Sequence, residues 1–294
     1  MKKFKKLNNL NYTNDDIMKV VNDIHESGYG KLKSVLPKTL CENLANAADD
    51  IEKTKLKLTK QKDLITKTLS KSIKNGQTFI RNVILDKPEL FMPLIDLKPI
   101  MLVLERIFKD IFILDGLGIS KSQKIERKFT RTPPHVDSHI VSPRKSHILD
   151  IVACICLDDF TKYNGATKVW PKSHRSGVLI HKDPKYKNKI PLGAIDLLCS
   201  KGDIFFFTGQ TWHQIGENKN NKRRWGVLSH YKRWWIKPSI DYTRCGKNIF
   251  KKLNDTQKIL LGFTSRTPSP TSGRLKTILD ISKLSDDYDK AITS

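Results

Sequence analysis

The sequence predicts a mainly β protein with flanking helices (α+β), in which a helical N-terminal half packs on an antiparallel sandwich or barrel. Up to about residue 112, apolar residues recur at helical intervals. Beyond about residue 113, short β-branched and apolar runs are separated by Gly, Pro, Asn and Asp, as in antiparallel folds. The chain has 294 residues, of which 38% are hydrophobic, enough for one large domain or two small ones.

The helical half begins with two helices separated by a turn, expected between residues 15 and 53. The expected buried face of the first helix consists of Ile17, Val20, Val21 and Ile24. Gly28 and Gly30 end this helix, and the second begins at Pro37. Residues 54–73 are polar and predict a loop or a solvated helix, whereas residues 97–112 predict an amphipathic helix whose apolar stripe belongs to the core.

Strands are expected in the second half. The three segments are residues 147–160 (HILDIVACICLDDF), 202–216 (GDIFFFTGQTWHQIG) and 224–235 (RWGVLSHYKRWW). Cys154 and Cys156 share a face of the first segment and are expected to be small core residues. The acidic pair Asp158–Asp159 that follows is expected to cap a turn, because adjacent side chains on a strand end diverge. The Pro- and Ser-rich residues 264–274 predict irregular chain, followed by a short polar helix.

The composition restricts the partners and the compartment. With 54 basic and 30 acidic residues the formal net charge is +24, which raises nucleic acid or an anionic substrate as a partner. The lysines are dispersed, however, so a solvated Lys-rich surface is the preferred interpretation. No run of about 18 apolar residues predicts a membrane span. No export signal is recognised. The five cysteines are an odd number, scattered and without C-x-x-C spacing, which favours buried thiols in a reducing compartment, with the cytoplasm as the default.

The first candidate for chemistry is the stretch TPPHVDSH, residues 132–139. Two prolines followed by alternating polar groups predict the start of a strand. Side chains at i and i+2 of a strand share a face, so His135 and Asp137 would point the same way and could bind one ion. His139 also falls on this face, and a solvent-facing or supporting role is preferred for it.

Three histidines, at positions 147, 174 and 213, are possible partners for this pair. His213 is the best placed, because it follows a buried-looking strand and a turn. Two histidines and one carboxylate on one side of a metal leave three positions open, an arrangement that suits non-haem Fe(II) and O2 chemistry. A 2-oxo acid bound there would need a cation for its far carboxylate. Arg223 and Arg224 both follow at a strand start, and strand parity alone does not decide between them.

An ordered set of motifs resembles the phytanoyl-CoA dioxygenase family of Fe(II)/2-oxoglutarate-dependent oxygenases. The motifs are HVD at 135–137, GATKVWPKSHRSG at 165–177 and GDIFFFTGQTWHQIGENKNNKRRW at 202–225. The family pattern has an arginine eleven places after the distal histidine, which selects Arg224. The resemblance covers roughly residues 15 to 275. One departure is Lys172, which stands where the family usually has Gly before Ser-His.

The resemblance implies a double-stranded β-helix, that is, a jelly-roll, cupin-like barrel with an N-terminal helical buttress. It implies one oxygenase domain over residues 1–294, divided into a helical part (1–112), a jelly-roll core (113–245) and a C-terminal extension (246–294). His135, Asp137 and His213 would be the catalytic Fe(II) ligands, and Arg224 and Thr167 would bind 2-oxoglutarate. The cosubstrates would be 2-oxoglutarate and O2, giving succinate, CO2 and a hydroxylated C–H bond. The carboxylate of Asp137 argues against halogenation, because halogenating relatives lack it.

The primary substrate is not predicted beyond a small molecule or an acyl compound. The basic loop at residues 181–189 indicates that it is anionic, such as a phosphate or CoA ester. The alternative function is a basic jelly-roll protein that binds or modifies nucleic acid, which the +24 charge leaves open. A jelly-roll binding module with a vestigial metal site is a third possibility, opposed by the intact set of His135, Asp137, His213 and Arg224.

Overall fold

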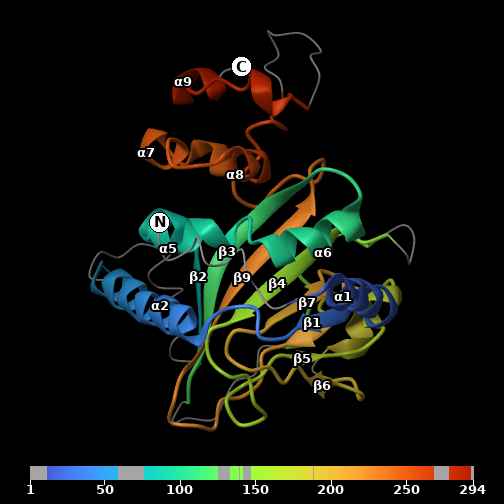
Figure 1. Ribbon diagram of the computed structural model, residues 1–294. Coiled ribbons are helices and arrows are strands. Elements are labelled where there is room, and N and C mark those ends of the chain that lie inside the picture. The colour runs from blue at the N-terminus through green and yellow to red at the C-terminus, as the bar shows by residue number, and fades with distance from the viewer. Residues whose placement is uncertain are drawn as a thin grey trace.

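The structure is a computed structural model (Figure 1) that describes residues 12–58, 76–124, 133–138, 140–141, 147–187, 189–267 and 278–292. Its centre is a six-stranded sheet in the order β1-β7-β4-β9-β3-β2, in which every neighbouring pair is antiparallel. The strands are β1 (Tyr29–Leu32), β2 (Gln77–Arg81), β3 (Phe112–Ser122), β4 (Asp150–Cys156), β7 (Ile204–Thr208) and β9 (Arg224–Arg233).

A smaller sheet lies against the large one and has the order β6-β5-β8. Its strands are β5 (Lys168–Val169), β6 (Ile195–Asp196) and β8 (His213–Gln214). The antiparallel, sheet-rich core predicted from the sequence is therefore confirmed, and it is consistent with a jelly roll. Within the described residues the two sheets do not join into a closed barrel.

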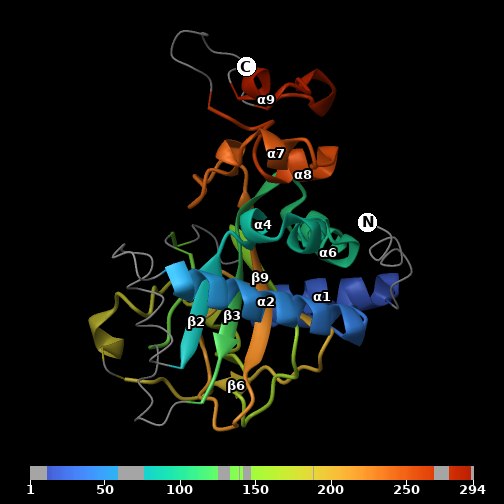
Figure 2. The same cartoon turned by 90° about the vertical axis from the view of Figure 1, so that its left-hand side faces the viewer.

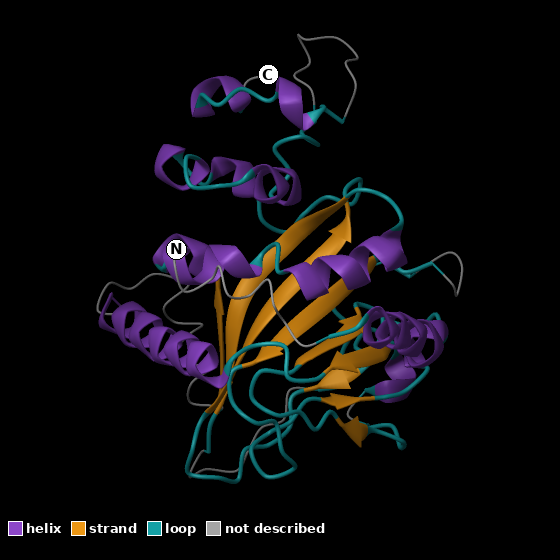
Figure 3. Cartoon of the chain, in the orientation of Figure 1, coloured by secondary structure: helices purple, strands orange, loops and turns teal. Residues whose placement is uncertain are grey.

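Helices cover one face of the large sheet, as Figures 2 and 3 show. They are α1 (Asn14–Ser27), α2 (Lys38–Leu58), α4 (Val83–Asp86), α5 (Pro88–Phe91), η2 (Met92–Leu94) and α6 (Lys98–Phe108). A second group lies beyond the end of the strands with the C-terminus (Figure 1): η5 (Tyr242–Arg244), α7 (Lys247–Phe250), α8 (Asp255–Leu260), η6 (Ile281–Lys283) and α9 (Tyr288–Ala291). Two further turns of 3₁₀-helix are η3 (Ser173–Arg175) and η4 (Pro184–Tyr186).

Helix α1 follows from its local sequence. Thr13 caps the N-terminus by accepting a hydrogen bond from the backbone N–H of Asp16, whose carboxylate in turn accepts from the backbone N–H of Thr13. The helix ends at Gly28, which has φ 87°, a left-handed conformation that favours glycine. Its predicted buried residues Ile17, Val20, Val21 and Ile24 are all buried. The prediction for this helix is confirmed.

The N-terminal half is less purely helical than expected. It contributes both edge strands of the large sheet, β1 and β2. Strand β2 was not among the predicted elements, and it pairs with β3 from Gln77–Ser122 to Arg81–Gly118. Helix α2 also extends beyond the predicted segment, to Leu58. Residues 59–75 lie outside the described chain.

The core has two layers because strand residues alternate between faces. On the helix-covered face of β4, β7 and β9 lie Ile151, Ala153, Ile155, Ile204, Phe206, Trp225, Val227 and Tyr231. On the opposite face, Val152, Cys154, Cys156, Phe205 and Phe207 pack between the two sheets. All five cysteines are free, and Cys154 and Cys156 are buried as predicted. Among the described helices, none is both long and apolar enough to cross a membrane.

Candidate metal centre and cosubstrate pocket

His135 and His213 are neighbours through their backbones. His135 N donates to His213 O at 3.0 Å, and His213 N donates to His135 O at 2.9 Å, an isolated antiparallel bridge outside the larger ladders. The bridge places the two rings with centroids 4.2 Å apart. His213 is fixed further by β8, where it pairs with Val169, and by Phe207, whose ring centroid is 4.6 Å from its own. The expected strand at residue 135 is thus reduced to one bridge.

Backbone carbonyls orient both imidazole rings. The Nδ1–H of His135 donates to the Pro133 carbonyl at 3.1 Å, and the Nδ1–H of His213 donates to the Thr211 carbonyl at 2.9 Å. Both rings therefore present the Nε2 lone pair. These Nε2 atoms lie 3.9 Å (His135) and 3.6 Å (His213) from Oδ1 of Asp137. The ligand atoms of the three residues all lie within 4.8 Å of one another.

The charges of this group suit a divalent metal. Burial, with the neighbouring charge of His213, lowers the pKa of His135 to about 4, so the ring is neutral near pH 7 and its lone pair is available. Burial alone would raise the pKa of Asp137, but the charges of His213 and His230 bring it below the ordinary value, so its carboxylate is ionised. Two imidazoles and one carboxylate are the donor set of facial non-haem iron sites.

Arg224 is the first residue of β9 and is only 2% exposed. Its guanidinium packs 4.0 Å from the centroid of the Phe160 ring, and one terminal N–H donates to the Gly165 carbonyl. Its buried Nε has no hydrogen-bond partner among the described residues. Burial lowers the pKa of Arg224 to about 10, so the group stays protonated at neutral pH. Arg224 lines the same cavity of about 860 Å³ as His135, Asp137 and His213.

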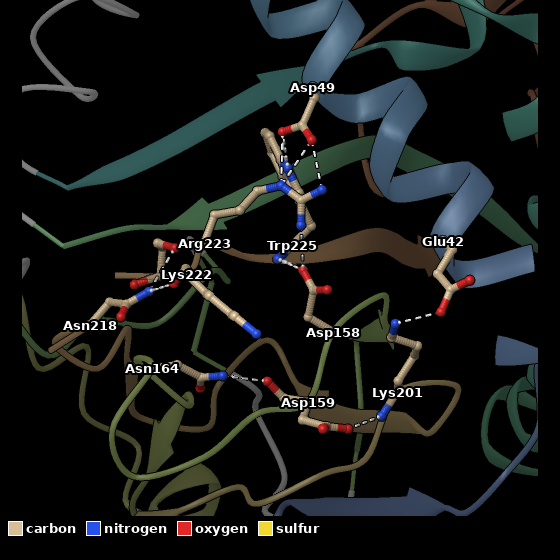
Figure 4. Close-up of polar contacts among 11 residues, drawn as sticks. Glu42, Asp49, Asp158, Asp159, Asn164, Lys201, Asn218, Lys222, Arg223 and Trp225 are labelled. Carbon is tan, nitrogen blue, oxygen red and sulfur yellow. Dashed lines mark hydrogen bonds and ion pairs between the residues drawn. The ribbon is translucent and has the colours of Figure 1, made fainter. Parts of the chain in front are cut away.

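Arg223 has a different environment, shown in Figure 4. Its guanidinium forms ion pairs with Asp49 of α2 at 2.6 Å and with Asp158 at 3.3 Å. Asp158 also accepts a hydrogen bond from the backbone N–H of Trp225, and Asp159 accepts from that of Lys201. The two carboxylates were predicted to cap a turn, but these contacts are with residues distant in sequence. Arg223 joins α2 to the sheet.

Thr167 lies just before β5 and also lines the cavity. The hairpin that follows it is attached to the strand that carries His213, because Ser173 Oγ accepts from the Trp212 backbone N–H at 2.9 Å. Lys172, the departure from the family pattern, has φ 66°, a left-handed conformation in which glycine is the favoured residue. Neither His147 nor His174 belongs to the metal-binding group. His139 lies outside the described residues.

Four charged residues of the cavity wall were missed by the sequence prediction. Asp115, Asp150, His230 and Lys232 form a connected set of ion pairs. One signal was available, because Arg224, Leu228, His230 and Lys232 are separated by even numbers and share one face of β9. Asp150 gave no such signal, because it stands among the first residues of a segment that otherwise predicts a buried apolar strand.

The fold and the site together define a class: an antiparallel β protein with a His-Asp-His facial metal site and a buried arginine. A model of the family described as "Phytanoyl-CoA dioxygenase (PhyH)" matches residues 24–226. The chain therefore belongs to the phytanoyl-CoA dioxygenase family, whose members are non-haem iron enzymes that use 2-oxoglutarate and O2.

Individual relatives are more distant. An uncharacterized protein of Mycobacterium tuberculosis is 30% identical over 121 residues, which cover 41% of this chain and 42% of the relative. The peroxisomal phytanoyl-CoA dioxygenase of Mus musculus is 28% identical over 134 residues, covering 42% of this chain and 39% of the enzyme. The chain thus matches about two fifths of the length of these curated relatives.

The fold is similar to that of solved enzymes. The epimerase SnoN, solved in complex with Fe3+, alpha-ketoglutarate and nogalamycin RO, has a TM-score of 0.56 and 16% identity, covering 78% of this chain and 89% of SnoN. The carbocyclase SnoK has a TM-score of 0.54 and 17% identity, covering 76% of this chain and 85% of SnoK. The family match supports the oxygenase interpretation and gives no support to the nucleic-acid alternative, whereas these two neighbours show the fold alone.

Proposed function

We propose that this protein is an Fe(II)/2-oxoglutarate-dependent dioxygenase that hydroxylates an unactivated C–H bond of a small-molecule substrate. The observation that supports this most is the convergence of His135, Asp137 and His213, whose ligand atoms lie within 4.8 Å of one another in the cavity that Arg224 also lines. Family membership supports the general kind of reaction.

The protein would hold the metal with the Nε2 atoms of His135 and His213 and the carboxylate of Asp137. The carbonyls of Pro133 and Thr211 keep both rings in the tautomer that binds metal. Iron held by these three residues would bind the 2-oxo acid and supply the redox chemistry with O2.

Arg224 would bind the far carboxylate of 2-oxoglutarate. Its terminal N–H bond to Gly165 fixes the plane of the guanidinium, and the Phe160 ring supports one face of it. The unpartnered Nε–H is a buried donor that a carboxylate oxygen would satisfy. Thr167, on the same cavity wall, is a second donor for this end of the cosubstrate.

The overall reaction balances as follows. 2-Oxoglutarate loses CO2 and becomes succinate, which receives one atom of O2. The other oxygen atom is inserted into a C–H bond of the substrate, which becomes an alcohol. The two electrons from 2-oxoglutarate and the two from the C–H bond together reduce O2.

The test is anaerobic loading with Fe(II) and 2-oxoglutarate, followed by air and a screen of small-molecule extracts. We expect succinate release that depends on Fe(II), and one product heavier by one oxygen atom. A product of unchanged mass would indicate epimerisation, and loss of two hydrogens would indicate ring closure or desaturation, so either would contradict hydroxylation. His213→Ala and Asp137→Ala should abolish succinate release while leaving the circular dichroism spectrum unchanged.

We also propose that residues 1–294 form one oxygenase domain with the three parts given above. Strands β1 and β2, from the N-terminal part, are strands of the large sheet, and α2 is joined to that sheet by Asp49. The helical part therefore shares its hydrophobic core with the strands that follow.

A further inference from the structure

The cavity extends well beyond the part needed for 2-oxoglutarate. Arg224 and His230 lie on one face of β9, six residues apart, which corresponds to about 20 Å along a strand. The strand register brings residues of β3, β4 and β9 close together around His230. Asp150 of β4 lies opposite Lys232 of β9, and Gly116 of β3 lies opposite His230. We call this part of the cavity the distal end. It is lined by Arg81, Asp115, Asp150, His230, Lys232 and Lys237.

Four of these residues form a charged cluster. Asp115 pairs with Lys232 at 2.8 Å and with His230 Nδ1 at 3.4 Å, and His230 Nε2 lies 3.3 Å from Asp150 Oδ2. Burial alone would lower the pKa of His230, but Asp150, Asp137 and Asp115 raise it above the ordinary value. Protonation of His230 gives this cluster two anions and two cations, so the cluster needs no further counter-ion.

Two kinds of group remain unused at the distal end. The Oδ1 atom of Asp150 has no hydrogen-bond partner among the described residues, although Asp150 is only 5% exposed. Arg81 and Lys237 are exposed, and no ion pair joins either of them to another described residue. The Arg81 guanidinium lies 4.9 Å from the centroid of the Phe79 ring, and its charge helps to lower the pKa of Asp137. A buried acceptor favours a donor, and two cations without an ion pair favour an anion.

From this geometry, and on the basis of the proposed function, we infer that the distal end binds the primary substrate and that this substrate is a small organic acid with a hydroxyl or amino group. Its carboxylate contacts Arg81 and Lys237, and its donor group reaches Oδ1 of Asp150. An aliphatic acyl chain does not suit this position, because it would leave Oδ1 of Asp150 and the cationic groups of Arg81 and Lys237 without polar partners.

The experiment uses the full chain loaded with Zn(II) and 2-oxoglutarate, which is inert and diamagnetic. Three probes of matched length are titrated by ligand-observed NMR: 6-hydroxyhexanoate, its methyl ester, and hexanoate. We expect 6-hydroxyhexanoate to bind about tenfold more tightly than the ester, which lacks the charge, and severalfold more tightly than hexanoate, which lacks the donor.

Variants assign these preferences to residues. Combining Arg81→Gln with Lys237→Gln should abolish the preference for acid over ester, and Asp150→Asn should abolish the preference for the hydroxyl group. Arg244→Gln is the matched control, because Arg244 is exposed and does not line the cavity; it should change neither preference. The dissociation constant of 2-oxoglutarate is measured for each variant to show that the metal end is intact.

Several outcomes would overturn the inference: no binding of 6-hydroxyhexanoate, equal binding of acid and ester, or an effect of the double variant no larger than that of Arg244→Gln. Failure of the wild-type protein to bind 2-oxoglutarate in a metal-dependent way would instead contradict the proposed function. The two hypotheses therefore fail on different measurements.

Discussion

Neighbouring residues on a strand face opposite sides of a sheet, and Arg223 and Arg224 show the consequence. Arg223 lies on the outer face and pairs with Asp49 and Asp158, while Arg224 lies on the inner face, buried in the cavity wall. The sequence indicated that one of them faces the site, and the family spacing selected Arg224. Which face is the inner one depends on α2, whose position relative to β9 local patterns do not give.

The two arginines predict opposite effects of the same substitution. Arg224→Gln should weaken 2-oxoglutarate binding about 10- to 100-fold, because a charge-assisted pair of hydrogen bonds is lost. Arg223→Gln should leave this affinity within about twofold and lower the free energy of unfolding instead, because it leaves the Asp49 carboxylate without its cationic partner. Isothermal titration of 2-oxoglutarate into Zn(II)-loaded variants measures the first effect, and urea unfolding measures the second. If Arg223→Gln weakened 2-oxoglutarate binding and Arg224→Gln did not, the assignment of Arg224 to the cosubstrate would be wrong.

The left-handed conformation of Lys172 predicts that replacing it with glycine raises the free energy of unfolding. A left-handed conformation costs a non-glycine residue about 1–2 kcal/mol, whereas glycine loses about 0.5–1 kcal/mol more backbone entropy on folding. Lys172→Gly should therefore stabilise the protein by about 0.5–1 kcal/mol in urea unfolding, and its backbone bond to the Ser27 carbonyl is retained. Lys182→Gly is the control, because Lys182 lies in the following turn without a positive φ. Lys182→Gly should lower the free energy of unfolding. Equal changes in the free energy of unfolding for the two substitutions would show that the left-handed conformation of Lys172 costs no stability.

His230 predicts a pH dependence of stability. Its folded pKa lies above the unfolded value of about 6.5, so the stabilisation is fully present below about pH 6.5 and is lost as pH rises through the folded pKa. Asp115, Asp150 and Asp137 favour the charged ring, and Lys232 is the neighbouring cation. The free energy of unfolding should therefore fall, as pH rises above about 6.5, more steeply in the wild type than in His230→Gln. Parallel profiles would show that folding does not raise the pKa of His230.

At the scale of elements, helix α2 is attached to the sheet by polar contacts as well as by its apolar face. Asp49 accepts hydrogen bonds from Arg223 and from the indole N–H of Trp225, and one turn on, Glu52 pairs with Lys121 in a buried ion pair. The i and i+3 positions place both carboxylates on the same side of the helix. Helix α2 is thereby held over the outer face of β9, the strand whose inner face carries Arg224.

A double-mutant cycle on Asp49 and Arg223 tests this attachment. We expect a coupling energy of about 1–2 kcal/mol in unfolding, because the pair is half-buried and the guanidinium donates two hydrogen bonds to one carboxylate. The adjacent pair Asp50–Lys87 is the control: its carboxylate is 60% exposed, and its coupling should be below about 0.5 kcal/mol. Similar couplings for both pairs would mean that Asp49 does not position the helix.

The elements predicted from the sequence are those whose pattern is decided locally. The face of α1 is set by aliphatic spacing and by its two caps, and the strands at 150–156 and 204–208 are set by runs of buried residues. Strand β2 was not predicted, because its burial alternates only over Gln77–Arg81 and its partner β3 is about forty residues away. The charged cluster was missed for the same reason, since its four residues meet only through the pairing of β3, β4 and β9.

At the scale of the whole molecule, the proposed metal ligands come from distant parts of the chain. His135 and Asp137 precede β4, and His213 lies in β8 after β7, so the site exists only when the two sheets have packed. The types of residue and their order were enough to predict that these three side chains meet. The tautomers of His135 and His213 were not predictable from the sequence, because they depend on hydrogen bonds to the carbonyls of Pro133 and Thr211.

Because the site is assembled by folding, its ligands should stabilise the fold in a fixed order. A ligand that binds only the folded state adds RT ln(1 + [L]/Kd), about 2.7 kcal/mol at a hundredfold excess over Kd. Zn(II) should therefore raise the melting temperature, 2-oxoglutarate should raise it further only when metal is present, and a chelator should reverse both. Each rise in melting temperature can be assigned to the residues that bind the ligand concerned. Asp137→Ala should lose both, whereas Arg224→Gln should keep the metal increment and lose that of 2-oxoglutarate. Stabilisation by 2-oxoglutarate in Asp137→Ala would place its binding site away from the three ligands.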